Sequence, residues 1–188
     1  MIHEDFFANA MGVFIRYGFR KTSMDDIATA VGLSRQAIYN RFGNKDALFT
    51  AVVDAAVQKY YRNASVALKD NSRPLRQRLL EASMCSAGEY IEALRSSPHS
   101  YEVIALTNAE AGELADTLRE EFNHFAAELL LNENVFIDTA AARDALFVIE
   151  TASNGLLHKA KTLQEYHDGM ETVIRTVVPG TPKTQLTE

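Results

Sequence analysis

The sequence predicts an all-α protein, in which a small amino-terminal helix-turn-helix domain precedes a larger helical domain. Two observations support this fold class. Apolar residues recur at three- and four-residue steps along most of the 188-residue chain, whereas the period-two alternation of strands is missing. Glycine, proline and small polar residues fall between these periodic segments, where helices typically end and begin.

Composition and charge agree with a soluble globular protein. Apolar residues make up 47% of the chain and charged residues 23%. Residues 1–50 hold six Lys/Arg and five Asp/Glu, a net charge of +1, whereas residues 51–188 hold thirteen and twenty, a net charge of −7. The amino-terminal quarter therefore differs from the rest, although +1 by itself is too small to indicate nucleic-acid binding.

The single cysteine, Cys85, excludes an intrachain disulfide and favours a reducing, cytoplasmic location. The amino-terminal "MIHEDFF" is acidic and lacks the pattern of a signal peptide. No window approaches the roughly 18 apolar residues of a membrane helix, so we expect no membrane association.

Four helices are predicted in the first third of the chain, each bounded by a residue suited to capping. Thr22 is expected to cap the second helix by accepting a hydrogen bond from the backbone N–H of Asp25, and Gly32 ends that helix. Ser34 is expected to cap the third. The predicted ranges are about 3–17, 23–31, 35–42 and 45–68.

Further helices are predicted to the end of the chain, with breaks at "DNSRP", "SSP" and "NENVFID". Pro74 and Pro98 each suit the first turn of a helix. The predicted ranges are about 74–94, 98–106, 110–131, 138–160 and 164–178. Residues 179–188 are expected to form a disordered tail.

The stretch "GLSRQAIYNRF", residues 32–42, carries the functional signal. On a helical wheel, Ile38 and Phe42 point inward, and Gln36, Tyr39 and Asn40 lie opposite. With the second helix and the "GLS" turn, this helix forms a helix-turn-helix, whose second helix enters the major groove of DNA. Arg, Gln and Asn match base edges in hydrogen-bonding geometry. The alternative is a solvated polar face on a small surface helix.

The sequence "FIRYGFRKTSMDDIATAVGLSRQAIYNRFGNKDALF", Phe14 to Phe49, resembles the DNA-binding domain of the tetracycline-repressor (TetR) family. The resemblance implies a homodimeric, ligand-responsive repressor that binds a palindromic operator. It places Lys45, Thr22 and Ser23 at phosphate contacts. It implies DNA-facing positions for Ser34, Arg35, Gln36, Ala37, Tyr39, Asn40 and Arg41.

Departures from the family pattern leave the operator sequence open. Ala37 stands where a hydroxyl residue is common, and Gln36 stands where glycine is frequent. The predicted domains are residues 1–47 for DNA binding and residues 48–178 for effector binding and dimerisation.

The last two predicted helices carry apolar stripes, which we expect to form the dimer interface unless they face their own core. The interface residues are Leu146, Ile149, Ala152, Ser153, Leu156, Val173, Ile174 and Val177. A largely apolar effector pocket is expected among the middle helices. Its candidate residues are Met84, Cys85, Tyr90, Tyr101, Ile104, Asn108, Phe122 and Phe125.

Enzyme and cofactor motifs are missing from the sequence. The five histidines show no ligand spacing with Cys85 or with carboxylates, and no nucleophile elbow or phosphate-binding loop occurs. We therefore expect no enzyme activity, no metal and no cofactor. Two other functions stay open, a DNA-binding regulator without an effector and a helical small-molecule carrier or enzyme.

Overall fold

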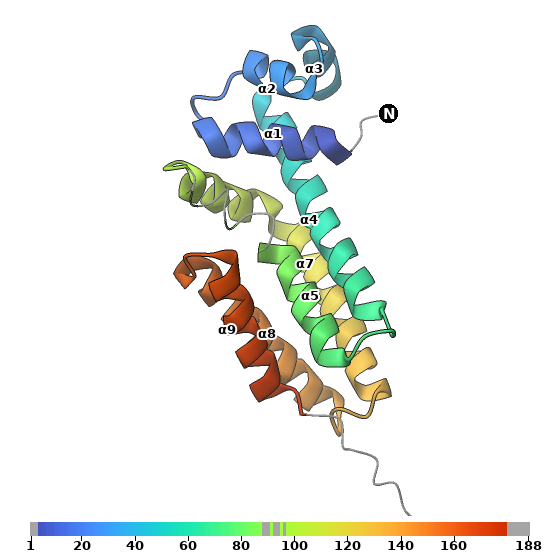
Figure 1. Cartoon of the computed structure of the whole chain (residues 1–188). Coiled ribbons are helices and arrows are strands. Elements are labelled where there is room, and N and C mark those ends of the chain that lie inside the picture. The colour runs from blue at the N-terminus through green and yellow to red at the C-terminus, as the bar shows by residue number, and fades with distance from the viewer. Residues whose placement is uncertain (1–3, 88–90, 92–94, 96, 180–188) are drawn as a thin grey trace, which may run out of the picture. The chain divides into compact units, whose positions relative to one another are not determined.

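The computed structural model describes residues 4–87, 91, 95 and 97–179, and every regular element in these residues is a helix, as predicted (Figure 1). None of the helices in this part of the chain is both long and apolar enough to cross a bilayer. The helices are α1 (Glu4–Tyr17), α2 (Met24–Val31), α3 (Arg35–Phe42), α4 (Lys45–Lys69), α5 (Leu75–Ala87), α7 (Ser100–Asn132), α8 (Thr139–Lys159) and α9 (Leu163–Val177).

The chain forms two compact units. Unit 1 comprises Met1–Arg62 and Glu89–Leu118, and unit 2 comprises Asn63–Gly88 and Arg119–Glu188. Both α4 and α7 begin in unit 1 and end in unit 2. Unit 1 extends beyond the predicted boundary at residue 47, because Val53 of α4 and Val103 and Ala111 of α7 belong to its hydrophobic core.

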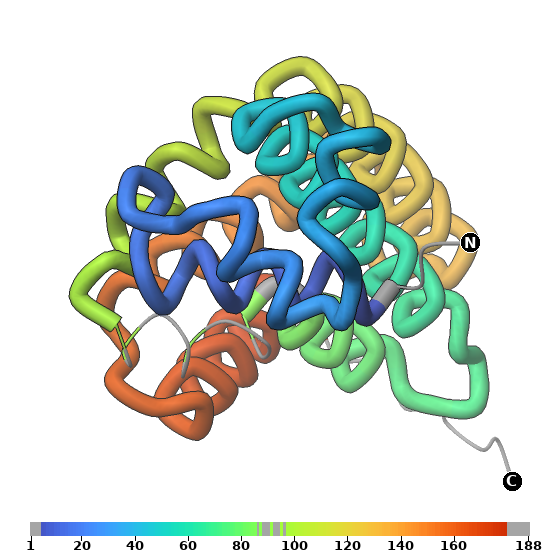
Figure 2. The backbone as a smooth tube through the Cα atoms, turned by 90° about the horizontal axis from the view of Figure 1, so that it is seen from above, coloured from blue at the N-terminus to red at the C-terminus, as the bar shows by residue number. Residues whose placement is uncertain are grey.

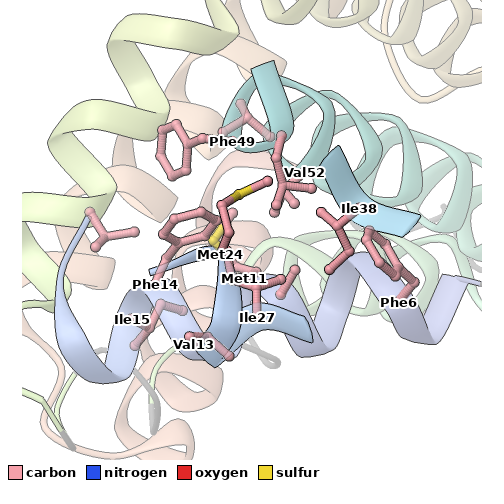
Figure 3. Close-up of a cluster of buried hydrophobic side chains, with 14 of the residues drawn as sticks. Phe6, Met11, Val13, Phe14, Ile15, Met24, Ile27, Ile38, Phe49 and Val52 are labelled. Carbon is pink, nitrogen blue, oxygen red and sulfur yellow. The ribbon is translucent and has the colours of Figure 1, made fainter. Parts of the chain in front are cut away.

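The core of unit 1 holds α2 and α3 in place. Phe14, Ile27, Ile38 and Val52 come from four different helices, and each has no exposed surface (Figure 3). Burying an apolar side chain of this size contributes about 1.5–3 kcal/mol. The path of the backbone through α1, α2 and α3 can be followed in Figure 2. The apolar faces of these short helices therefore fix how α3 is presented.

Unit 2 is built from α5, α8, α9 and the later parts of α4 and α7. Tyr166, Met170 and Ile174 form the buried stripe of α9. The Tyr166 hydroxyl donates to the carbonyl of Ser83 at 3.2 Å and shares a 2.7 Å hydrogen bond with the Ser153 hydroxyl. These buried polar groups satisfy one another, so α5, α8 and α9 pack around them without an unpaired hydroxyl.

One helix boundary differs from the prediction. A gap was expected between Leu106 and Glu110, but α7 continues through these residues and departs from helical geometry at Gly112, with φ 24° and ψ −113°. The Thr107 hydroxyl donates to the carbonyl of Val103 at 2.8 Å, so this threonine is accommodated within the helix. The helix predicted over 74–94 is described as far as Ala87, and most of its remainder lies outside the described residues. Residues 180–188, which make up most of the predicted tail, also lie outside the described residues.

Candidate nucleic-acid interface

The turn between α2 and α3 is fixed by caps on both sides. Ser34 begins α3, and its hydroxyl accepts from the backbone N–H of Ala37 at 3.1 Å, as predicted. Gly32 ends α2 with φ 68°, a left-handed conformation that glycine adopts without steric cost. These caps set where α3 starts, and therefore which side chains lie in its first turn.

The cap of α2 lies one residue later than predicted. Ser23, and not Thr22, is the N-cap, and it forms a capping box with Asp26. The Ser23 backbone N–H donates to the Asp26 carboxylate at 2.9 Å, and hydrogen bonds from Ser23 lower the pKa of Asp26. Thr22 is buried instead, and its hydroxyl donates to the carbonyl of Gly18 at 2.7 Å. Thr22 therefore stabilises the α1–α2 turn, and its contact with a phosphate stays a prediction.

The helix α3 presents one polar face to solvent. Its only fully buried residue is Ile38, whereas Gln36 and Asn40 lie exposed on the other side. Tyr39 is half-buried. The remaining predicted contacts, Ser23, Ser34, Arg35, Ala37 and Arg41, are all exposed. One helix thus carries most of the side chains that the sequence assigned to DNA.

The polar side chains of this face pair with one another. Arg35 Nη1 donates to Asp25 Oδ2 at 2.8 Å, and the Arg35 guanidinium lies 5.2 Å from the centre of the Tyr39 ring. The Tyr39 hydroxyl, followed by the Asp25 carboxylate, raises the pKa of Arg35. Gln36 Nε2 donates to Asn40 Oδ1 at 2.7 Å. The arrangement places donors and acceptors for DNA base edges on one surface.

Lys45 lies at the first position of α4 but points toward the α1–α2 turn. Its ammonium donates to the carbonyls of Phe19 at 2.8 Å, Thr22 at 3.0 Å and Arg20 at 3.3 Å. It also lies 4.7 Å from the centre of the Phe19 ring. All three N–H donors of Lys45 thus have acceptors within the protein, which the sequence did not indicate.

A comparison with protein families adds to this geometry. Residues 7–52 match the family model described as "Bacterial regulatory proteins, tetR family". Over these residues the chain is similar to the tetR family. The matched segment contains most of α1 and all of α2 and α3, and therefore the whole polar face described above.

The relatives agree with the family match. The HTH-type transcriptional repressor ComR of Escherichia coli (strain K12) is 35% identical over 51 residues, which cover 27% of this chain and 24% of ComR. A transcriptional regulator from Rhodococcus sp. Rha1 matches with a TM-score of 0.70 at 16% identity, covering 96% of this chain and 100% of its own. The multidrug binding protein EbrR, complexed with imidazole, matches with a TM-score of 0.52 at 17% identity, covering 96% of both chains. The described chain thus shares the fold of tetR-family regulators.

The residues predicted for the effector pocket fall in both units. Met84, Cys85, Phe122 and Phe125 belong to unit 2, and each is half-buried. Tyr101, Ile104 and Asn108 belong to unit 1, where Tyr101 and Asn108 are exposed. Tyr90 lies outside the described residues. The Phe125 ring has the Lys69 ammonium 4.9 Å from its centre, so this part of unit 2 combines aromatic and charged groups.

The residues predicted for the dimer interface divide by burial. Leu146, Ile149, Ser153 and Ile174 face the interior of unit 2, which is the alternative that the sequence left open. Ala152, Leu156, Val173 and Val177 are half-buried. The exposed side of α8 instead carries Phe147, Val148, Thr151 and Gly155, of which Phe147 is 68% exposed. A surface contact through α8 would have to use this side.

One histidine departs from the expectation about metal ligands. His167, Asp168 and Glu171 on α9 have potential ligand atoms that all lie within 4.8 Å of one another. The Asp168 carboxylate is already bonded to the His167 ring at 3.2 Å and to the Gln164 amide at 2.7 Å, and these two contacts lower the pKa of Asp168. Asp168 and Glu171 are exposed, so the group is a solvated face of α9 that happens to have ligand spacing.

Proposed function

We propose that the protein is a transcriptional regulator that binds a palindromic DNA site as a homodimer and represses transcription until a small molecule releases it. The observation that carries the proposal is the exposed face of α3, with Gln36 and Asn40 opposite the buried Ile38, inside a segment that matches the tetR family. A surface helix with no partner would not require this matched arrangement of caps, core and polar face.

The proposed contacts with DNA divide into two classes. Arg35, Gln36 and Asn40 read base edges in the major groove, because their donor and acceptor geometry fits those edges. The proposed phosphate contacts come from side-chain groups at the helix starts and along the edges of α3, which position the protein on the duplex without reading sequence. They are Ser23, Ser34, Tyr39 and Arg41, with the neighbouring Ala37 exposed on the same surface.

A test of base reading compares substitutions on this face. Gln36→Ala should alter the sequence preference, with a loss of about 1–3 kcal/mol at the base pair where a bidentate contact is removed. Tyr39→Phe should instead weaken binding to all sequences alike, because a phosphate contact positions the protein without reading sequence. The measurement is enrichment from a random-sequence duplex library, followed by titration of single-base variants. An unchanged preference in Gln36→Ala would contradict the base-reading role.

The proposed homodimer uses the exposed side of α8. Phe147 and Val148 supply apolar surface, and the small residues Thr151 and Gly155 allow another helix to approach closely. A closed dimer brings the same patch of both subunits together. A palindromic site requires the two copies of α3 in such a dimer to lie one DNA turn apart, about 34–36 Å.

The proposed effector is a small apolar or amphipathic molecule. EbrR, which shares the fold, is by its name a multidrug binding protein. In this chain, Met84, Cys85, Phe122 and Phe125 of unit 2 offer half-buried apolar and aromatic surface for such a ligand. Since α4 begins at α3 and ends in unit 2, a ligand-dependent change in its orientation would alter the spacing of the two reading helices.

Thermodynamic linkage tests the effector proposal. A tenfold loss of operator affinity requires a preference of about 1.4 kcal/mol for the released state, and operator DNA must then weaken effector binding by the same factor. Effector affinity is measured by titration calorimetry with and without saturating operator, after a compound screen by thermal shift. Equal affinities would favour the alternative, a DNA-binding regulator without an effector. A protein that enriches no duplex at all would favour a helical small-molecule carrier.

A further inference from the structure

Asp25 lies beside α3, the helix proposed to contact base edges, and has no role in the core or in the cap of α2. Its neighbour Asp26 closes the capping box, whereas the Asp25 carboxylate accepts from Arg35 at 2.8 Å. This ion pair joins the first turn of α2 to the first residue of α3. The two side chains are 60% and 58% exposed. Because exposed ion pairs contribute little to folding stability, a role for this pair belongs with what the surface binds.

Arg35 is restrained on two sides. Besides the bond to Asp25, its guanidinium lies 5.2 Å from the centre of the Tyr39 ring, and Arg35 Nη2 is 3.5 Å from the Tyr39 hydroxyl. Gln36 and Asn40 are paired with each other on the same face. Each side chain proposed to read bases therefore already has a partner within the protein, and a bidentate contact with a base edge has to displace part of this pairing.

Phosphates and base edges differ in where along a duplex they offer acceptors that could replace the bond between Arg35 and Asp25. Phosphates are present at every step of any duplex, so an unrestrained arginine on this surface would bind all sequences. A guanine edge offers two acceptors, O6 and N7, that match the guanidinium geometry, but only at particular positions. The Asp25 carboxylate holds Arg35 and repels phosphates. It therefore weakens contacts of Arg35 with the phosphate backbone more than contacts with a guanine edge.

We propose that Asp25 is a specificity-determining residue, which keeps Arg35 from the phosphate backbone and releases it where a base edge takes its place. This inference rests on the proposed DNA-binding function. In this inference, Asp25 acts through Arg35. It affects the discrimination between DNA sequences and does not contribute to the fold of the domain.

The experiment uses full-length Asp25→Asn, which removes the charge and keeps the shape. The probes are the duplex that the unmodified protein enriches from a random library and a scrambled duplex of the same composition. Binding to the scrambled duplex should tighten about two- to fivefold, the size expected for one exposed ion pair. The slope of log affinity against log salt should steepen by about 0.9, as for one additional phosphate contact. The enriched duplex should gain less, so the specificity ratio falls.

Two comparisons separate this mechanism from a general effect of charge. Asp46→Asn removes the same charge from an exposed position in the first turn of α4, and it should leave the ratio between the two duplexes unchanged. In an Arg35→Gln background, Asp25→Asn should no longer change the ratio, because the partner through which it acts is gone. Circular dichroism verifies that all variants fold.

The outcomes distinguish the inference from the function on which it rests. If the unmodified protein enriches no duplex, the proposed DNA-binding function fails. If it enriches a duplex, but Asp25→Asn and Asp46→Asn behave alike, DNA binding stands and the role of Asp25 is wrong. An Asp25→Asn effect that persists in the Arg35→Gln background would equally overturn it, because the effect would not pass through Arg35.

Discussion

At the scale of single residues, Lys45 shows how a surface charge can serve the fold. Its ammonium bonds three carbonyls of the α1–α2 turn and lies over the Phe19 ring. The turn leads directly to Ser23, the N-cap of α2. The family resemblance implies a phosphate contact for Lys45, whereas its hydrogen bonds show that it also holds the start of the helix-turn-helix.

We predict that Lys45→Ala lowers both stability and DNA affinity. Three carbonyls lose a charged donor, and those of Phe19 and Thr22 are part-buried, so the loss should cost about 1–3 kcal/mol in the free energy of unfolding. Urea unfolding measures this loss. Lys21→Ala, which removes an exposed charge from the same turn, is the matched control and should change stability by less than about 0.5 kcal/mol.

The salt dependence of DNA binding separates the two roles of Lys45. If Lys45 contacts a phosphate in the complex, the salt slope of Lys45→Ala should become shallower by about 0.9. An unchanged slope together with lowered stability would mean that Lys45 stabilises the fold but does not contact a phosphate. Unchanged stability would contradict the hydrogen-bonded role that the structure gives this lysine.

At the scale of helices, α4 and α7 meet in unit 1 through polar groups. The Thr50 hydroxyl of α4 donates to the Glu110 carboxylate of α7, two residues before the irregular backbone at Gly112. Asp54 lies one helical turn after Thr50. Burial, and to a lesser extent the charge of Glu110, raises the pKa of Asp54. Two carboxylates therefore oppose each other where these helices meet.

We predict that Asp54→Asn stabilises the protein at neutral pH. A carboxyl group with a raised pKa in the folded state supports folding while it is protonated, and this support is lost as the pH rises from 3.8 through the folded pKa. At pH 7 the ionised Asp54 is thus unfavourable. Its replacement should add about 0.5 kcal/mol, or roughly 1–2 °C in Tm.

The pH dependence provides the control for Asp54. Thermal melts should show the gain at pH 7 and a smaller gain as the pH is lowered toward 4. Asp144→Asn, an exposed substitution on α8, should not show this trend. A gain of equal size at both pH values would mean that burial and Glu110 are not the cause.

At the scale of the whole molecule, two neighbouring positions on α8 should respond in opposite ways to a charge. Phe147 is 68% exposed, so Phe147→Asp should leave each subunit folded and dissociate the proposed dimer. Ile149 is 7% exposed, so Ile149→Asp should bury an unpaired carboxylate and lower stability by several kcal/mol. Light scattering measures the mass, and circular dichroism measures unfolding.

The unmodified protein and the second variant decide between the two faces of α8. A folded monomer of the unmodified protein would remove the dimer proposal. A dimer that survives in Phe147→Asp would place the interface elsewhere. If Ile149→Asp stayed as stable as the unmodified chain but became monomeric, the original prediction from the apolar stripe would be restored.

The sequence by itself determined the all-α class, the turn from Gly32 to Ser34, and the opposition of Ile38 to Gln36 and Asn40 on α3. These features depend on helical periodicity and on caps, which act between residues at most about four positions apart.

Only the tertiary structure decided which neighbour each face meets. On α8, apolar residues occur on two sides, and packing against the rest of unit 2 buries Ile149 while leaving Phe147 exposed. The contacts of Asp25 with Arg35, and of Lys45 with the carbonyl of Phe19, join residues 10 and 26 positions apart. Periodicity states which side chains share a face, but the partner of that face depends on how separate helices pack.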